Sequence, residues 1–257
     1  MSTDAEKGGV KMEEGNRERR IISPGDFLRG QDVEANKHKF TKALISFMSI
    51  REMASKFGGE YSESPIFSHT SEPFLVREDG TILVGRVYGG PFCSIILEEL
   101  AFFGVKHAVG YGFSGTLDSS IAPGNIMVAE SGICSDGTSK EYTEDAEVPA
   151  DQGMLASIMN IAKGYSIELK PGKVWTTDAL YREYPSKIAT WQSAGARFCN
   201  LETSPFYTVS KAVGIKAVYI SVVSDDVTGS KWSGWNSDLT KAIEAMWDIS
   251  LDMIDSL

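Results

Sequence analysis

Apolar and polar positions alternate with two different periods along the chain from about residue 41 onward. Short apolar, β-branched runs, typical of buried strands, are separated by longer stretches with helical spacing. The predicted strands cover residues 43–48, 81–88, 107–111, 126–129, 173–177, 198–201 and 217–224, and the predicted helices cover residues 50–57, 91–103, 154–163, 186–194 and 204–213. Strands and helices that alternate in this way predict an α/β layer fold with a largely parallel or mixed sheet.

The two ends of the chain differ in character. Near the carboxyl end, Asn236 or Ser237 can cap a helix that has one apolar face, formed by Leu239, Ile243, Trp247, Leu251 and Ile254. Residues 1–20 are polar and rich in Gly, Glu, Lys and Arg, so we expect a disordered tail. Because no repeat or long linker divides the rest, we predict one domain over residues 21–257.

Composition narrows the choice of partners. The 257 residues are 42% hydrophobic, and 35 acidic against 25 basic side chains leave a formal charge of −10. The charges are scattered, so the basic surface that nucleic-acid binding needs is missing. No apolar run approaches the ~20 residues that span a bilayer, and the first 20 residues contain no apolar segment typical of a signal peptide. We therefore expect a cytoplasmic protein with neither nucleic-acid nor membrane partners.

The cysteines indicate neither a disulfide framework nor a metal site. Cys93, Cys134 and Cys199 lie far apart and form no Cys-x-x-Cys pair. We predict buried thiols. No cluster of His, Cys and Asp has metal-ligand spacing, so no metal is expected.

Glycine-rich segments follow two of the predicted strands. They are Gly89-Gly90-Pro91 and the stretch from Gly110 to Thr116. Glycines at the carboxyl end of a strand allow tight turns and close approach to a ligand, and this edge of an open α/β sheet is where ligands bind. The dinucleotide-binding fingerprint is not met, and an ordinary turn is the simpler interpretation of each segment.

Carboxylates stand at the ends of three further strands. Asp178 follows the strand at 173–177, where a helix cap is the simplest role. Glu202 follows the strand at 198–201, where it can accept hydrogen bonds from neighbouring sugar hydroxyls or stabilise a helix start. Asp225 and Asp226 end the strand at 217–224, and such a pair can raise one pKa toward the value that a general acid needs.

Taken together, these motifs resemble a known family. The series GGP…EEL, GVKHAVGYGFSGTL…PGNIMV, SDGTSKEY, VWTTDALYRE, GARFCNLETSPFYTV and VVSDD is similar in order and spacing to the purine nucleoside and uridine phosphorylases, over about residues 41–256. The resemblance implies a three-layer α/β/α sandwich with a mixed, partly barrel-like central sheet. It also implies a homo-oligomer, as a dimer, trimer or hexamer.

The resemblance further implies cleavage of the N-glycosidic bond of a nucleoside. Members of the family pass the sugar to phosphate as a co-substrate or, in the nucleosidase branch, to water, and they need no cofactor. By motif, Glu202 would bind the ribose hydroxyls with Leu201 beneath the sugar. Asp225 would face the base and donate or hold a proton at purine N7, with Ser224 orienting it. An acid beside the base and a carboxylate beside the sugar stabilise the charges that develop as the bond breaks.

Other positions are carried over by the same resemblance. We expect Phe198, Thr177 and Asp178 in the pocket wall, and Gly112 and Phe113 in the substrate-binding glycine segment. Uridine phosphorylases carry a Gln-x-Arg pair that reads uracil, and this chain lacks it, so a purine is the better expectation. The segment from Lys231 to Trp235 brings Trp232 and Trp235, either as a lid over the base or as core or inter-subunit packing.

The phosphate-binding positions depart from the family pattern. Gly110 stands where an arginine is usual, Phe113 stands where Ser or Thr is usual, and no arginine occurs near Ser68-His69. The segment from Pro24 to Arg29 resembles the phosphate loop, which makes Gly25 and Arg29 candidates. By spacing, however, residues 43–48 form the better first strand, and Arg51 just beyond them is the other candidate.

Three functions follow from these observations. Phosphorolysis of a purine nucleoside is the first hypothesis, carried by Glu202 and Asp225. Hydrolysis is the second, because the usual arginines are absent, and Glu52 is the acid that could activate water. Binding of a nucleoside without catalysis is the third.

Overall fold

The computed structural model describes residues 20–28, 39–57, 60–63, 72–229, 232–234 and 238–257. Most of the predicted tail lies outside the described residues, and so do Arg29 and Trp235.

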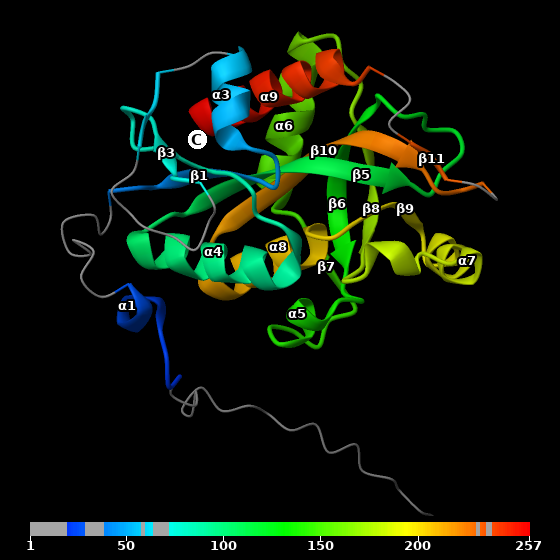
Figure 1. The fold of residues 1–257 in the computed structure, drawn as a ribbon, viewed down its shortest axis with the longest axis horizontal. Coiled ribbons are helices and arrows are strands. Elements are labelled where there is room, and N and C mark those ends of the chain that lie inside the picture. The colour runs from blue at the N-terminus through cyan, green and yellow to red at the C-terminus, as the bar shows by residue number, and fades with distance from the viewer. Residues whose placement is uncertain (1–19, 29–38, 58–59, 64–71, 230–231, 235–237) are drawn as a thin grey trace, which may run out of the picture.

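Five strands close into a barrel at the centre of the molecule. β5 (His107–Thr116) pairs in parallel with β10 (Lys216–Asp226), which pairs antiparallel with β6 (Ile126–Ile133). β6 pairs in parallel with β8 (Lys170–Thr176), β8 in parallel with β9 (Ala196–Asn200), and β9 antiparallel with β5. The carboxyl ends of β5 and β10 point toward β11 and α7 (Figure 1). This closure makes the sheet mixed and barrel-like, as predicted.

The remaining strands extend the sheet from the barrel. β1 (Lys42–Ser46) pairs in parallel with β5 and with β4 (Ile82–Val84). Antiparallel pairs complete the sheet, formed by β3 (Leu75–Val76) with β4, β2 (Ser62–Glu63) with β3, β7 (Glu147–Pro149) with β6, and β11 (Ser233–Gly234) with β10.

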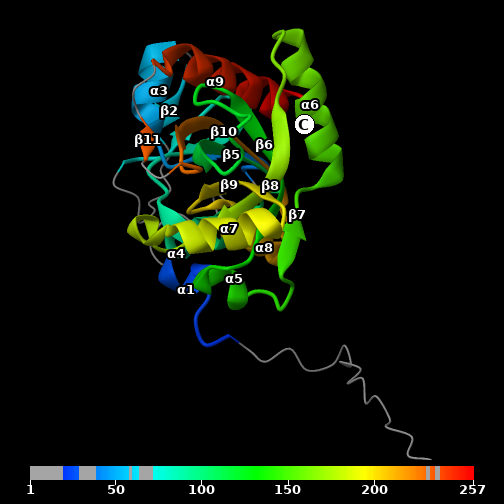
Figure 2. The same cartoon turned by 90° about the vertical axis from the view of Figure 1, so that its right-hand side faces the viewer.

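Helices cover both faces of the sheet (Figures 1 and 2). One face carries α4 (Gly89–Phe103) and α8 (Thr203–Val213), with α5 (Gly137–Lys140) and α1 (Pro24–Phe27) beside them. The other face carries α3 (Ile50–Phe57), α6 (Gln152–Gly164) and α9 (Thr240–Asp255), while α7 (Pro185–Ser193) packs against β9. None of the helices in the described parts of the chain is long and apolar enough to cross a membrane.

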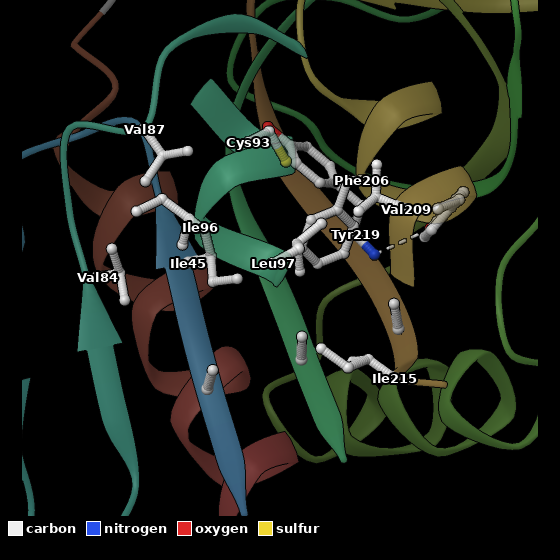
Figure 3. Close-up of a cluster of buried hydrophobic side chains, with 14 of the residues drawn as sticks. Ile45, Val84, Val87, Cys93, Ile96, Leu97, Phe206, Val209, Ile215 and Tyr219 are labelled. Carbon is white, nitrogen blue, oxygen red and sulfur yellow. Dashed lines mark hydrogen bonds between the residues drawn. The ribbon is translucent and has the colours of Figure 1, made fainter. Parts of the chain in front are cut away.

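The core between the sheet and the α4–α8 layer fixes where these two helices begin. Ile96 and Leu97 of α4 and Phe206 of α8 pack with Ile45 of β1 and Tyr219 of β10, all nearly inaccessible to solvent (Figure 3). Full burial of one large apolar side chain stabilises a fold by about 1.5–3 kcal/mol. The packing therefore holds the starts of α4 and α8 firmly against the sheet.

The predicted secondary structure agrees with these elements in type and order. The predicted helix at 50–57 coincides with α3, and the apolar face predicted near the carboxyl end is buried in α9. α9 begins at Thr240, after the two predicted capping residues, which lie outside the described residues. The predicted strand at 81–88 ends at Val84, because Arg86 adopts a left-handed backbone conformation with φ of 56°.

The glycine-rich stretch after residue 109 is not a turn, contrary to expectation. β5 continues through Thr116. A Cβ atom on Gly110 would overlap the ring of Tyr219, and one on Gly112 would overlap the ring of Phe47. These glycines therefore allow aromatic rings to cross the strand at close range, which is one of the known roles of glycine inside strands.

Candidate active site

A cavity of about 1050 Å³ opens at the carboxyl ends of three barrel strands. β5 contributes Ser114 and Gly115, β9 contributes Cys199 and Asn200, and β10 contributes Ser224 and Asp225 to its wall. The loops after β1 and β4, the segment from residue 180 to 188, and Trp232 complete it. Three of the strand ends that the sequence singled out, those of β5, β9 and β10, thus meet in one place.

Glu202 is buried at the start of two helices. Its side chain belongs to a residue only 6% exposed, at the N-cap of α8. Oε1 accepts a hydrogen bond of 2.9 Å from the backbone N–H of Gly89, the first residue of α4, and Oε2 accepts one of 3.2 Å from the N–H of Leu201. Burial raises its pKa to about 7, and the two backbone hydrogen bonds oppose that rise. The carboxyl is therefore held in one orientation and poised to titrate near neutrality.

Asn200 ends β9 and fixes the turn that presents Glu202. Its Oδ1 accepts hydrogen bonds from the backbone N–H groups of Glu202 and Thr203, at 3.3 and 3.1 Å. Its Nδ2 donates to the hydroxyls of Thr203 and Ser114, at 2.8 and 3.3 Å. One side chain thus caps α8 and ties it to β5.

Asp225 lies where β10 has a bulge next to β5. The register with β5 shifts between Val223 and Asp225. Oδ1 accepts a hydrogen bond of 2.6 Å from the hydroxyl of Ser224, and Oδ2 accepts one of 3.0 Å from Nε1 of Trp232. Bulges commonly re-aim a side chain next to an active site, and here both oxygens of the carboxylate are engaged.

A second carboxyl, that of Glu183, lies on the same cavity wall. It follows the short 3-10 helix η1 (Leu180–Arg182) and is half-buried. Burial raises its pKa to about 7, and the charge of Asp225 adds to the rise. Within the described chain, no three His, Cys, Asp or Glu side chains are grouped so that they could hold a metal ion.

Arg86 supplies the positive charge at another part of the cavity. Its guanidinium Nη2 lies 3.4 Å from Oε1 of Glu52, and its Nε lies 3.5 Å from Oε2 of Glu72. Glu72 is buried and also accepts hydrogen bonds from the hydroxyl of Ser49 and the N–H of Ile50. Arg86 is the one Lys or Arg among the described residues that line this cavity, and it already faces two carboxylates.

Aromatic rings line the cavity close to Arg86. Phe47 packs against Tyr88 and Phe113, with ring centroids 5.9 and 5.5 Å apart. Met48 and Met53 add apolar surface. This part of the cavity is therefore largely apolar apart from the Arg86–Glu52 pair.

The structure brings together five of the residues predicted for the site. Glu202, Asp225, Leu201, Ser224 and Phe113 all line the cavity.

Four of the predicted substrate-binding residues, Phe198, Gly112, Thr177 and Asp178, do not line this cavity. Phe198 points into the hydrophobic core with no exposed surface, because the alternation along β9 turns Cys199 toward the cavity instead. Gly112 is covered by the ring of Phe47.

The predicted loop residues Thr177 and Asp178 line a smaller neighbouring cavity of about 470 Å³, which shares Leu201 with the main one. Asp178 does not cap the helix that follows it in the chain. Its Oδ2 instead accepts a hydrogen bond of 2.8 Å from the N–H of Gly137, so the carboxylate anchors the start of α5.

Two of the three phosphate-binding residues expected from the sequence, Arg51 and Gly25, lie away from the main cavity, and the third, Arg29, lies outside the described residues. Arg51 is on the outer side of α3, where it forms an ion pair with Glu63. Gly25 lies in α1, against the ring of Phe102 near the far end of α4. For Arg51 the reason is geometric, because α3 turns Glu52 toward the cavity instead.

Sequence reasoning missed two charged residues of the cavity. Arg86 was hidden inside a predicted strand, and only its left-handed backbone turns it toward the cavity. Glu183 ends the motif VWTTDALYRE, so its proximity to a candidate site was visible, but the loop that aims it was not.

Comparison with known proteins gives the family. The family model described as the phosphorylase superfamily matches residues 43–248. The chain belongs to the phosphorylase superfamily. The superfamily match spans the barrel strands, α4 and α8, and every cavity carboxylate described above.

Individual members of the superfamily share a modest part of their sequence with this chain. A guanosine phosphorylase from Halorubrum lacusprofundi is 28% identical over 164 residues, which is 62% of this chain and 68% of that protein. A solved purine nucleoside phosphorylase from Toxoplasma gondii has a TM-score of 0.73 at 20% identity, covering 87% of this chain and 92% of that one. A 5'-methylthioadenosine/S-adenosyl homocysteine nucleosidase from Campylobacter jejuni has a TM-score of 0.70 at 17% identity, covering 85% and 100%. The fold is thus shared with phosphorylases and nucleosidases alike.

Proposed function

We propose that this protein cleaves the N-glycosidic bond of a purine nucleoside. The observation that carries the proposal is the presence, in one cavity, of a buried Glu202 held by two backbone N–H groups and of Asp225 at the end of β10, on the other side of β5 from β9. Names of related proteins support the reaction class, since they include both purine phosphorylases and nucleosidases.

Each carboxylate has a separate task in this reaction. Ionised Glu202 accepts hydrogen bonds from the two hydroxyls of the ribose, and its negative charge stabilises the sugar as it becomes oxocarbenium-like. Asp225 faces the base, where charge changes as the C1'–N9 bond breaks. Trp232, 62% exposed and hydrogen-bonded to Asp225, offers a flat apolar surface to a purine ring.

Water is the acceptor that the cavity's charges support best. Four acidic residues line the cavity, Glu52, Glu183, Glu202 and Asp225, against Arg86 as the single basic residue in the described part of its wall. Oxygens of phosphate need several donors and positive charge, and a dianion is repelled by carboxylates. The residue at position 110 cannot supply an arginine, because Tyr219 and Phe206 occupy the space beside it.

Phosphate is the second candidate acceptor, and one observation favours it. The guanidinium of Arg86 faces the cavity, and it is 38% exposed, so phosphate could replace Glu52 as its partner. The name of the Halorubrum lacusprofundi relative, a guanosine phosphorylase, is in keeping with this alternative.

Base release measured with and without phosphate distinguishes the acceptors. We expect phosphate-stripped protein to release hypoxanthine from inosine together with free ribose, and added phosphate to change the rate by less than about twofold. Release that requires phosphate and yields ribose 1-phosphate would establish the second candidate. Saturable inosine binding without release of base would exclude both reactions.

Replacing Glu52 tests how water is activated. Glu52→Gln removes the acidic side chain beside the apolar, acceptor-side part of the cavity while keeping its size. Because general bases contribute typically 10²–10⁴-fold, we expect hydrolysis of inosine to slow by about 100-fold. The inosine KM should stay within about threefold, since Glu52 is not expected to bind the nucleoside itself. Unchanged turnover would remove Glu52 from the mechanism.

A further inference from the structure

The carboxyl groups of Asp225 and Glu183 both line the cavity, and their surroundings differ. Asp225 has both oxygens occupied as acceptors, from the hydroxyl of Ser224 and from Nε1 of Trp232. Both acceptor oxygens are thus occupied, so the carboxylate of Asp225 is fixed in place.

Glu183 has the opposite environment. Within the described residues, no donor hydrogen-bonds its carboxyl, although it is half-buried and lines the cavity. Within the described residues the neighbouring Arg182 forms no ion pair with Glu183, and its guanidinium donates to the hydroxyl of Tyr184 at 2.7 Å. A carboxyl with little hydration and no donor is easier to keep as the neutral acid.

The groups that face Glu183 reinforce this state. From β10, Asp225 presents a negative charge, and from β9, Cys199 presents a buried thiol whose own pKa is raised well above its usual value, first by burial. Neither compensates a negative charge on Glu183. Its pKa is raised to about 7, by burial first and by Asp225 second, so a proton is available at neutral pH.

We propose that Glu183 donates the proton that the leaving base takes, while Asp225 stays ionised beside it. This inference rests on the proposed function and deepens it, since it separates two tasks that the resemblance assigned to Asp225 alone. The O–H of Glu183 gives its proton to N7 of the purine as the C1'–N9 bond breaks. The bonding electron pair goes to the base, which leaves as a neutral purine, while water attacks C1' and passes one of its protons to Glu52. Glu183 is left as a carboxylate and regains a proton from solvent.

Asp225 then acts through its charge. While N7 carries the incoming proton and the C1'–N9 bond is still partly formed, the imidazole ring of the base is positively charged. A fixed carboxylate beside that ring stabilises it without moving. The hydrogen bonds from Ser224 and Trp232 hold Asp225 in that place.

A comparison of two substrates distinguishes proton donation by Glu183 from a role in binding or structure. Inosine needs a proton at N7 in order to lose its base. 7-Methylinosine already carries the methyl group and positive charge at N7, so its base leaves neutral without any proton. The experiment measures kcat/KM for both nucleosides with the unsubstituted protein, Glu183→Gln, Asp225→Asn and, as a control with the same chemical change at an exposed residue outside the cavity, Glu144→Gln.

We expect Glu183→Gln to lower kcat/KM for inosine by about 100-fold and to change it by less than about threefold for 7-methylinosine. Asp225→Asn should lower both by about 100-fold, because both bases are cationic near the transition state. Glu144→Gln should match the unsubstituted protein. The pH profile for inosine should fall above pH 7, and in Glu183→Gln this alkaline limb should disappear.

Three results would overturn the inference. Equal loss on both substrates in Glu183→Gln would mean that Glu183 serves binding or structure. Full activity of Glu183→Gln on inosine would mean that it has no role. Selective loss on inosine in Asp225→Asn would make Asp225 the donor. Absence of base release from either nucleoside by the unsubstituted protein would instead refute the proposed function, and the inference with it.

Discussion

Glu202→Gln is expected to lower kcat/KM for a purine nucleoside by about 1000-fold, the upper range for loss of one fixed electrostatic contact in an active site. Two effects combine in this substitution. The charge that stabilises the oxocarbenium-like sugar disappears. In addition, glutamine has a single oxygen, whereas Glu202 accepts from two N–H groups, those of Gly89 and Leu201. The amide NH₂ must then face one of these donors, which disturbs the start of α4 or the turn before α8.

The measurement is steady-state kinetics together with binding of nucleoside and of free base. Because Glu202 is expected to hold the ribose, inosine should bind more weakly to the variant while hypoxanthine binds equally well. Glu144→Gln serves as the control again. Retention of activity within about threefold would refute the role of Glu202 in sugar stabilisation.

The pH dependence follows from two carboxyls that must be in opposite states. Glu202 acts when ionised, and burial raises its pKa to about 7, so activity should rise as pH increases through 7. Glu183 acts when protonated and also has a pKa raised to about 7, so activity should fall above that pH. With both groups half-titrated at pH 7, about a quarter of the molecules are in the active state, and a narrow bell-shaped profile results. Glu202→Gln removes the acidic limb, and Glu183→Gln removes the alkaline one.

The same shift of Glu202 affects stability. Its pKa in the folded state lies above the ordinary value for glutamate, because of burial. The folded protein therefore binds more protons than the unfolded chain between the two values, and the contribution to stability is present below the ordinary pKa and lost as pH rises through about 7. The ionised form of Glu202 that catalysis needs is thus the form that makes the folded state less stable.

The local pattern of apolar residues predicted much of the fold, because apolar residues recur at a different spacing in strands and in helices. The order of elements and the buried face of α9 were readable for that reason. Closure of the barrel was expected only from the family resemblance, because it depends on the pairing of β5 with β10, more than 100 residues away in the chain. The glycines of β5 were misinterpreted as a turn because the rings that need their space, Phe47 and Tyr219, come from distant segments.

The candidate site shows the same division. Glu202 and Asp225 were found because both follow the ends of strands, and the ends of β9 and β10 meet at one cavity beside β5. Residues whose direction depends on a loop or on unusual backbone geometry were missed, as for Arg86 with its positive φ and for Glu183 after η1. Arg51 and Glu52 were both candidates, for phosphate and for water activation, and only Glu52 lines the cavity, because one residue along a helix rotates a side chain by about 100°.

Gly132→Ala is expected to destabilise the fold by about 3 kcal/mol or more, the upper part of the range for overpacking a core. Gly132 lies in β6, where it pairs with Val148 of β7 and Val174 of β8. A Cβ atom there would lie 2.5 Å from Cα and 2.8 Å from the backbone N of Ser204 in the first turn of α8. Backbone atoms cannot give way as the end of a flexible side chain can.

Two hydrogen bonds of Ser204 oppose a displacement of α8. The N–H of Ser204 donates a hydrogen bond of 2.9 Å to the hydroxyl of Thr176, and the hydroxyl of Ser204 donates to Asp136. Moving this turn would also move Glu202, the N-cap of the same helix. Thermal unfolding of Gly132→Ala should therefore occur about 6–12 °C lower, and any folded fraction should also turn over more slowly.

Gly164→Ala is the matched control for this substitution. Gly164 is the last residue of α6, and a Cβ atom there would meet nothing within 4 Å. Alanine in a helix restricts the unfolded chain and should stabilise the protein by up to about 1 kcal/mol. If Gly132→Ala unfolds within about 1 kcal/mol of the unsubstituted protein, then α8 can shift against β6. Glu202, at the N-cap of α8, would then not be held rigidly, as the proposed chemistry requires.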